Sequence, residues 1–252
     1  MRLTEVAQTE LEKLLSKYKI ENYTIREDGR VDVNGDVDLS QKLFSELPIK
    51  FGRVTGFFSV QFCKDLISLE GAPESVGDWF FCAGCNKLTS LEGAPTSVGG
   101  NFSCSGCINL ISLKGAPQKV GGYFSCASCI KLNSLKEVPT EIGGMFTCSG
   151  CTKLTSLEGA PIKVDGSFNC HICFRLASLK DLPAQINGKL TLTSCPKILD
   201  LLMIFKTKGI TDIIHDDKKL EKIINKYLPK RDMLNCQDEL IEAGLEEYAE
   251  IE

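Results

Sequence analysis

The sequence has few of the residues that most catalytic and metal-binding sites use. Its 252 residues include a single tryptophan, Trp79, and two histidines, His171 and His215. The repeat register described below places no acid or nucleophile beside His171, so we expect no general acid–base catalysis and no catalytic residues. The glycine pairs recur at a fixed interval and form no phosphate-binding motif, which predicts no cofactor. We therefore expect a protein that is not an enzyme.

The chain also lacks a dominant charge and a long apolar run. It carries 29 Lys and Arg against 33 Asp and Glu, and this net charge of −4 predicts no nucleic-acid partner. It has no run of roughly 18 apolar residues and no charged segment followed by an apolar signal core. These absences predict no membrane partner, no secretion signal and a cytoplasmic location, where the 13 cysteines stay reduced.

What the sequence does have is a 22-residue repeat, seen most clearly in residues 88–109, LTSLEGAPTSVGGNFSCSGCIN. Seven units span residues 44–197 without an insertion. Phenylalanine recurs at one position of the unit, as Phe58, Phe80, Phe102, Phe124, Phe146 and Phe168. Leucine recurs at another, as Leu66, Leu88, Leu110, Leu132, Leu154 and Leu176. A column that is apolar at every repeat must be buried against the same column of the next unit, so the units stack around one continuous core.

Each unit contains the signals of one strand and two turns. The segment NFSCS (residues 101–105) alternates apolar and small polar side chains, which is the period of a β-strand. A turn such as Gly99-Gly100 precedes it, and a proline such as Pro95 favours an extended return path over a helix. The pattern predicts a β-rich repeat solenoid with about seven parallel strands on one face.

The frame L-x-x-L-x-x-A-P-x-x-V-G-G-x-F-x-C-x-x-C resembles a leucine-rich repeat, closest to the short proline-containing bacterial type. The chain is also similar to leucine-rich-repeat proteins of large tailed phages, which share the phrases SLEGAP and VGG. The resemblance implies that the strands line a concave face. Leucine-rich repeats are scaffolds for many partners, so it implies a binding protein, and the phage likeness implies one that inhibits a host defence protein.

The two ends of the chain are expected to close the open ends of this core. Within residues 1–43, a helical stripe that includes Leu11, Leu14 and Leu15 precedes a hairpin around Asp28-Gly29. Within residues 198–252 we expect a last strand at 210–214 and two helices, one stopped by Pro229 and one capped by Asp232. Acidic residues dominate from Asp232 onward, and they form either a solvated helix face or a site for a basic partner.

Five C-x-x-C pairs occur at a spacing that matches a four-cysteine zinc site: Cys82/Cys85, Cys104/Cys107, Cys126/Cys129, Cys148/Cys151 and Cys170/Cys173. In the end units Val60 and Leu192 replace the first cysteine, and a column that accepts valine and leucine is a core column. We therefore favour buried thiols that donate S–H groups to backbone carbonyls, with no metal. Zinc binding and a disulfide or redox role are the alternatives.

The residues that flank the buried phenylalanine and cysteine must face outward from the strands. Their columns hold large apolar or aromatic residues in the first units and, apart from Lys189, no charge. The candidate binding residues are Phe57, Trp79, Phe81, Tyr123, Met145 and His171. Aromatic residues and methionine with few charges are typical of a protein-interface centre, although large side chains also simply favour strands.

These observations predict a non-enzymatic protein-binding scaffold, and the phage resemblance implies that its partner is a protein of the host cell. One alternative is a small-molecule or nucleotide-binding sponge that stacks a ring on Trp79 and Tyr123, and another is a structural virion component. The sequence does not determine the oligomeric state.

Overall fold

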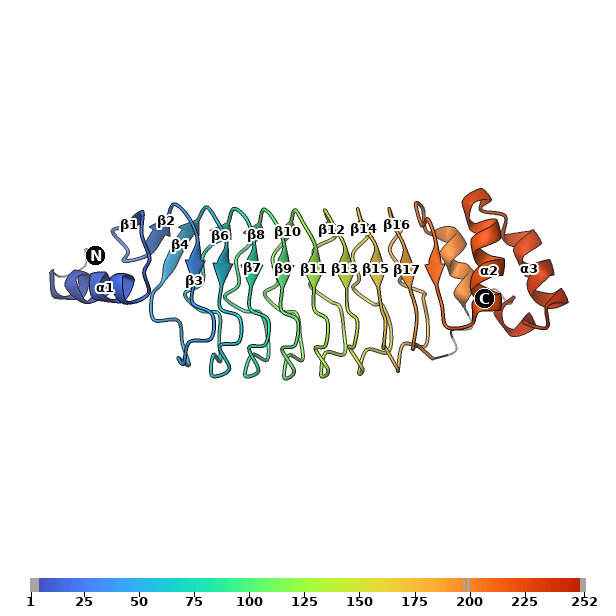
Figure 1. Cartoon of the computed structure of the whole chain (residues 1–252), viewed down its shortest axis with the longest axis horizontal. Coiled ribbons are helices and arrows are strands. Elements are labelled where there is room, and N and C mark those ends of the chain that lie inside the picture. The colour runs from blue at the N-terminus through green and yellow to red at the C-terminus, as the bar shows by residue number, and fades with distance from the viewer. Residues whose placement is uncertain (1–4, 197, 199, 250–252) are drawn as a thin grey trace.

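The protein is a parallel β-solenoid, seen in a computed structural model that describes residues 5–196, 198 and 200–249. Consecutive turns lie 22 residues apart, because Phe58 pairs with Phe80 and Phe80 pairs with Phe102. The turns stack along the long axis of the molecule, with a helix at the N-terminal end and helices at the C-terminal end (Figure 1). The predicted repeat solenoid with these ends is confirmed.

Each complete turn contributes one short strand to each of two nine-stranded sheets, called sheet A and sheet B, and one further strand at an end of the stack completes each sheet. Sheet A contains β1 (Tyr23–Ile25), β2 (Val31–Val33), β4 (Phe51–Val54), β6 (Ser75–Val76), β8 (Ser97–Val98), β10 (Lys119–Val120), β12 (Glu141–Ile142), β14 (Lys163–Val164) and β16 (Gln185–Ile186). Sheet B contains β3 (Val37–Asp38), β5 (Phe58–Ser59), β7 (Phe80–Phe81), β9 (Phe102–Ser103), β11 (Phe124–Ser125), β13 (Phe146–Thr147), β15 (Phe168–Asn169), β17 (Leu190–Thr191) and β18 (Ile213–Ile214). Neighbouring strands are parallel, except that β1 and β2 are antiparallel.

The prediction of one strand per unit is therefore incomplete. The strand after each glycine pair is confirmed and lies in sheet B, where Phe102 pairs with Phe124. The second strand holds the valine column, in which Val76 pairs with Val98 in sheet A. The strands of sheet B are as short as most of those in sheet A, but there the alternation continues past the strand, from Phe102 to Cys104. In sheet A the valine is followed at once by the glycine pair, as Val98 is by Gly99, so no alternation marks the strand in the sequence.

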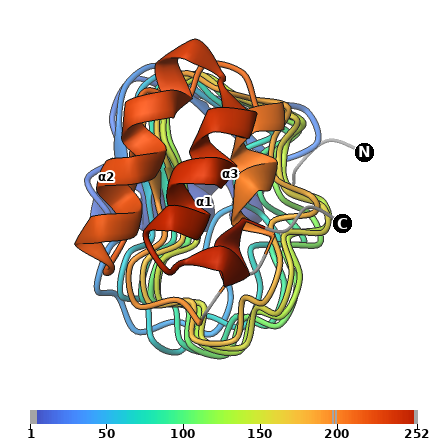
Figure 2. The same cartoon turned by 90° about the vertical axis from the view of Figure 1, so that its right-hand side faces the viewer.

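The predicted concave face is flat instead. The stack runs nearly straight in Figure 1, and its turns overlie one another in the view along the axis in Figure 2. Both sides of each turn are β-ladders with the same strand spacing of about 4.8 Å. No wider element on one side forces the stack to curve, so sheet B presents a straight outer surface.

The core consists of the predicted columns, each stacked on its own equivalents. The phenylalanine rings lie in a row at centroid distances of 4.9–5.7 Å from Phe58 to Phe168, and every one is fully buried. The leucine column is also fully buried, as Leu88 and Leu110 show. Such rows of aromatic and aliphatic side chains supply most of the apolar burial that stabilises a repeat stack.

The N-terminal end is covered by helix α1 (Glu5–Lys17) and by the antiparallel strand β1. Leu15 of α1 is fully buried, and Leu11 and Leu14 pack against the core. The predicted hairpin is confirmed, with Tyr23 opposite Val33. Strands β2 and β3 extend both sheets beyond the repeat array at this end.

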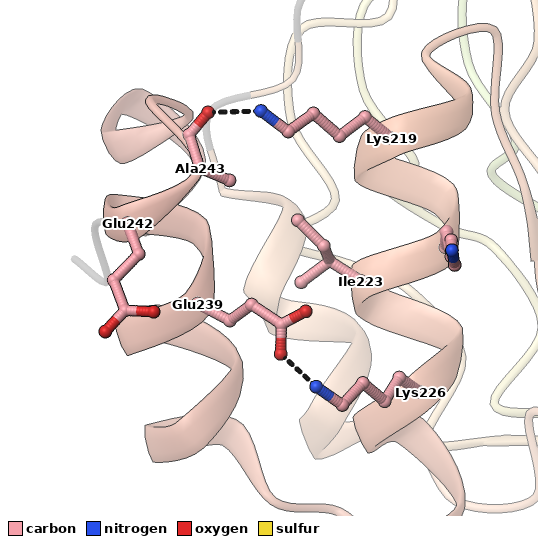
Figure 3. Close-up of a pocket in the computed structure, with 7 residues that line it drawn as sticks. Lys219, Ile223, Lys226, Glu239, Glu242 and Ala243 are labelled. Carbon is pink, nitrogen blue, oxygen red and sulfur yellow. Dashed lines mark hydrogen bonds and ion pairs between the residues drawn. The ribbon is translucent and has the colours of Figure 1, made fainter.

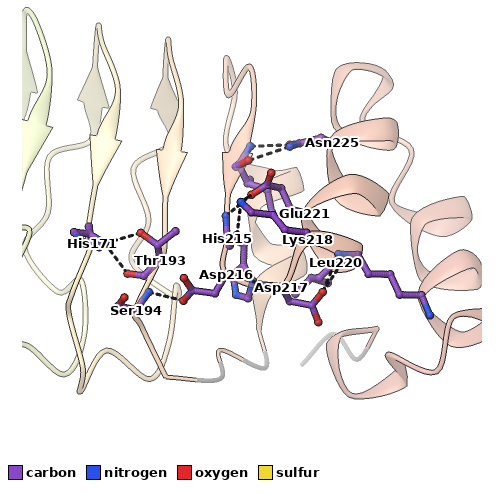
Figure 4. Close-up of polar contacts among 12 residues, drawn as sticks. His171, Thr193, Ser194, His215, Asp216, Asp217, Lys218, Leu220, Glu221 and Asn225 are labelled. Atoms are coloured by element: carbon purple, nitrogen blue, oxygen red, sulfur yellow. Dashed lines mark hydrogen bonds and ion pairs between the residues drawn. The ribbon is translucent and has the colours of Figure 1, made fainter.

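The C-terminal end contains η1 (Leu201–Lys206), β18, α2 (Lys218–Tyr227), η2 (Leu228–Lys230), α3 (Met233–Glu242) and η3 (Glu246–Tyr248). The predicted last strand is confirmed as β18, and Asp232 caps α3 by accepting the N–H of Asn235. The edge of β18 is closed by a side chain of α2. The Asn225 amide accepts the Ile213 N–H at 2.7 Å and donates to the Ile213 carbonyl at 2.9 Å, as a further strand would (Figure 4). No helix in the described part of the chain combines the length and apolarity that crossing a bilayer requires.

Candidate functional site

The candidate binding residues lie on the outward surface of sheet B, here called the sheet B face. This surface is built from the residues that flank the buried phenylalanine and first cysteine of each turn. Trp79 and Met145 are the most exposed of the candidates, at 42% and 39%. Phe57, Phe81 and Tyr123 are half-buried. The structure thus places large apolar side chains on the outside of successive turns, where only neighbouring turns cover them.

The structure brings the first three candidates together at one end of the face. Phe57 and Trp79 occupy the same position on adjacent turns, before β5 and β7. The Trp79 and Phe81 rings lie 5.7 Å apart at 37°. The indole also lies over the next turn, because a Cβ at Gly100 would approach its Cδ1 to 2.6 Å. We call Phe57, Trp79 and Phe81 the aromatic cluster.

Tyr123 and Met145 continue the same column after one polar residue, Asn101. The Asn101 side chain accepts the Tyr123 N–H at 2.9 Å, so it supports the next turn. Burial raises the pKa of the Tyr123 hydroxyl above its ordinary value. Tyr123 and Met145 therefore extend the apolar column beyond the aromatic cluster.

His171 stands apart from the aromatic cluster, four turns from Trp79, which corresponds to about 19 Å along the stack. Its Nδ1 lies 2.6 Å from the Thr193 Oγ1 and 3.2 Å from the Thr193 carbonyl (Figure 4). No carboxylate contacts the ring within residues 5–196, 198 and 200–249. The histidine–hydroxyl pair thus lacks the third group that would orient it for nucleophilic catalysis.

The middle column of the face is covered, although its side chains point outward as the alternation requires. Ser59, Ser103, Ser125 and Thr147 are only 4–8% exposed, because the two flanking columns shield them. Their hydroxyls bond to hydroxyls of the next outward column, as Ser125 Oγ does with Ser105 Oγ at 2.6 Å. This hydroxyl ladder is satisfied internally and stabilises the stacking of the turns.

The cysteines form a ladder of buried thiols in the core. The second cysteine of each pair donates its S–H to a backbone carbonyl of the preceding turn, for example Cys107 to the Cys82 carbonyl at 3.2 Å and Cys129 to that of Cys104 at 3.2 Å. Burial raises the pKa of Cys85 well above its ordinary value, so the thiol keeps its proton. The predicted S–H donation is confirmed. No group of three or more metal-ligating side chains occurs in the described part of the chain.

A cleft of about 570 Å³ lies between α2 and α3 (Figure 3). Lys226 of α2 pairs with Glu239 of α3, and this contact raises the lysine pKa and lowers the glutamate pKa. Lys219 donates to the Ala243 carbonyl at 2.6 Å, at the C-terminal end of α3. The charges lining the cleft hold the two helices together. Part of the predicted acidic run, residues 250–252, lies outside the described residues.

Phe62, which the repeat pattern does not single out, is 51% exposed at a corner of its turn. Its φ is 57°, a left-handed conformation that only glycine adopts without strain. The equivalent corners hold Gly84 and Gly106 in the same conformation. The same corner holds Gly150 but also Ser128, Ile172 and Ser194 at positive φ, so the glycines of this column do not by themselves single out Phe62 in the sequence.

Comparison with protein families, with curated proteins and with solved structures finds no significant match. The site is therefore interpreted from its own geometry.

Proposed function

We propose that this protein is a non-enzymatic scaffold that binds a protein partner on the sheet B face, with the aromatic cluster at the centre of the interface. The observation that supports this proposal is the exposure of Trp79, the single tryptophan, next to Phe57 and Phe81. The outward columns of sheet B carry charge only towards their ends, at Asp36 and Asp38 beside Phe57 and at Lys189 and Asp212. Aromatic side chains surrounded by uncharged residues are typical of the centre of a protein interface.

The dimensions of the apolar column suggest the kind of segment that binds. From Phe57 to Met145 the column spans four inter-turn steps, which is about 19 Å at a strand spacing of about 4.8 Å. A helix of about 13 residues has this length. We therefore propose a partner segment with an apolar stripe that lies along the stack. The hydroxyl ladder lies between the two flanking columns, and its hydroxyls already have hydrogen-bond partners within the protein.

The leucine-rich-repeat class and the phage likeness remain part of the proposal. Seven units with leucines, a proline and a core ladder at corresponding positions support the leucine-rich-repeat assignment, with cysteine in place of the usual asparagine. On this basis we propose a host protein, and in particular a defence protein, as the partner, which binding would inhibit.

The test is affinity capture from a host lysate with matched variants. Trp79→Ala and Phe81→Ala should each lower the affinity for a partner captured by the wild type about thirtyfold or more. Truncating a central aromatic residue typically costs about 2 kcal/mol of binding free energy. Glu158→Ala is the control, because Glu158 is exposed and pairs with Lys136 outside the face.

A partner that is lost with Glu158→Ala but retained by both aromatic variants would contradict this site. A small molecule that co-purifies with the wild type and is lost with Trp79→Ala would favour the ligand-binding alternative.

A further inference from the structure

A second exposed surface lies at the corner that follows the second cysteine of each turn. In the fourth to sixth complete units this corner carries Ile130, Lys131, Thr152, Lys153, Phe174 and Arg175, here called the basic ridge. Ile130 is 43% exposed and Phe174 is 59% exposed. They lie two turns apart, about 10 Å at a strand spacing of about 4.8 Å. The ridge thus combines two exposed apolar side chains with a row of cations.

The cations of the basic ridge are not balanced as they are elsewhere on the stack. Earlier at the same corner Lys87 pairs with Asp65 at 2.7 Å. At another corner Lys114 pairs with Glu92 and Lys136 with Glu158, both at 2.8 Å. Lys153 and Arg175, by contrast, form no ion pair with any residue that the structure describes. Like charges on adjacent turns repel one another, so this row does not stabilise the solenoid.

The outward side of α3 also combines two exposed apolar side chains with charged residues, but its charges are negative. Leu234 and Ile241 are 73% and 56% exposed and lie seven residues apart, so they share one side of the helix. Asp238 lies between them and Glu242 beside them, whereas Cys236 and Leu240 are buried on the opposite side. We call Leu234, Asp238, Ile241 and Glu242 the α3 outer face.

The carboxylates of the α3 outer face are also unbalanced. Asp238 and Glu242 form no ion pair within the described residues. Glu242 also lines the cleft between α2 and α3, but its carboxylate points away from the lysines of α2 in Figure 3. In Figure 1, α3 lies beyond α2 at the far C-terminal end of the stack. Its outer face is therefore free to meet another molecule, while its packing on α2 keeps it away from the basic ridge of its own chain.

We propose that the α3 outer face of one copy docks on the basic ridge of a second copy. The apolar side chains match in spacing, since seven residues of helix span about 10.5 Å, close to the two-turn separation of Ile130 and Phe174. The carboxylates of Asp238 and Glu242 are about 6 Å apart along the helix, near the one-turn spacing of Lys153 and Arg175. Both the shape and the sign of charge thus fit a helix lying along the ridge.

The contact joins two different surfaces, so a bound pair still presents one free basic ridge and one free α3 outer face. Such a heterologous contact leads to chains of molecules unless it closes into a ring. It buries a single helix face against a corner, which places it among small and transient interfaces. The association is therefore expected to be weak and sensitive to salt. It does not involve the sheet B face and is independent of the proposed function.

Sedimentation velocity of the full chain tests this proposal between about 1 and about 300 µM, the range over which small interfaces dissociate. The wild type should associate at about 0.05 M salt and largely dissociate at about 0.5 M, where screening is strong. Lys153→Glu and Asp238→Lys should each weaken association about tenfold or more, and the Lys153→Glu/Asp238→Lys double variant should recover it by restoring the opposite charges.

Lys180→Glu is the control with the same change of charge, because Lys180 is exposed on a different corner, and it should associate like the wild type. Circular dichroism and melting temperature verify that each variant is folded. A wild type that stays monomeric throughout, or association that Lys153→Glu leaves unchanged, overturns the proposal. Failure of the double variant to exceed both single variants overturns the pairing of these two surfaces.

Discussion

Alkaline pH should unfold this protein because its core contains protonated thiols. Burial raises the pKa of Cys63 and Cys85 above the ordinary value of 9.0, and it raises the pKa of Cys236 to about 12. All three side chains are fully buried. In the unfolded chain the same thiols are solvated and lose their protons near the ordinary pKa. The folded state thus binds more protons than the unfolded state above pH 9.

The size of this effect follows from proton linkage. Between the unfolded and folded pKa values, each thiol lowers the free energy of unfolding by about 1.4 kcal/mol per pH unit. At pH 10 Cys85 and Cys236 together remove about 3 kcal/mol of the roughly 5–15 kcal/mol that stabilises a typical domain, and Cys63 acts in the same direction. Their contribution is fully present below pH 9 and is lost as the pH rises towards about 12.

The free energy of unfolding is measured from about pH 7 to about pH 10 by urea titration followed by circular dichroism, with reductant present. The control replaces Cys104 and Cys126 by valine, since Val60 is fully buried in the same column. The pKa of each is raised by contact with a neighbouring thiol and by burial, so the Cys104→Val/Cys126→Val variant should lose less stability with pH than the wild type. A free energy of unfolding that is constant up to pH 10, or equal slopes for both proteins, would refute the reasoning.

Two further predictions concern the backbone. Asn225→Leu should lower the free energy of unfolding by about 2 kcal/mol, because it leaves the Ile213 N–H and carbonyl unpaired at the edge of β18; Asn225→Asp keeps one acceptor and should cost less in the same urea titration. Gly121→Ala should cost about 3 kcal/mol, since its Cβ would lie 2.1 Å from the Gly99 carbonyl oxygen. Gly106→Ala, which meets only atoms 3.8 Å or more away but has a φ of 70°, should cost about 1 kcal/mol; equal losses for the two alanine variants would contradict the steric argument.

The sequence alone determined the interior of the solenoid. A column such as Phe102 and Phe124 is apolar at every repeat only if it is buried between turns, so period and burial follow from one pattern. The same register assigned Cys107 to the core and anticipated its S–H bond to a carbonyl. The hairpin at Tyr23 and the strand at Ile213 were visible because turn and capping residues act over a few positions.

The outer surfaces depended on the tertiary structure. Whether an outward side chain is exposed depends on its neighbours two residues away and one turn away, so Ser125 is covered while Trp79 is not. The second sheet and the straight stack arise from pairing between turns, which two-residue strands such as β8 do not signal in the sequence. Stacking of the turns likewise places Lys153 next to Arg175, and the packing of α3 at the end of the stack keeps Asp238 away from both. Which side chains come together on a surface depends on their distances in space. A repeat column in the sequence specifies only which residues are buried between successive turns.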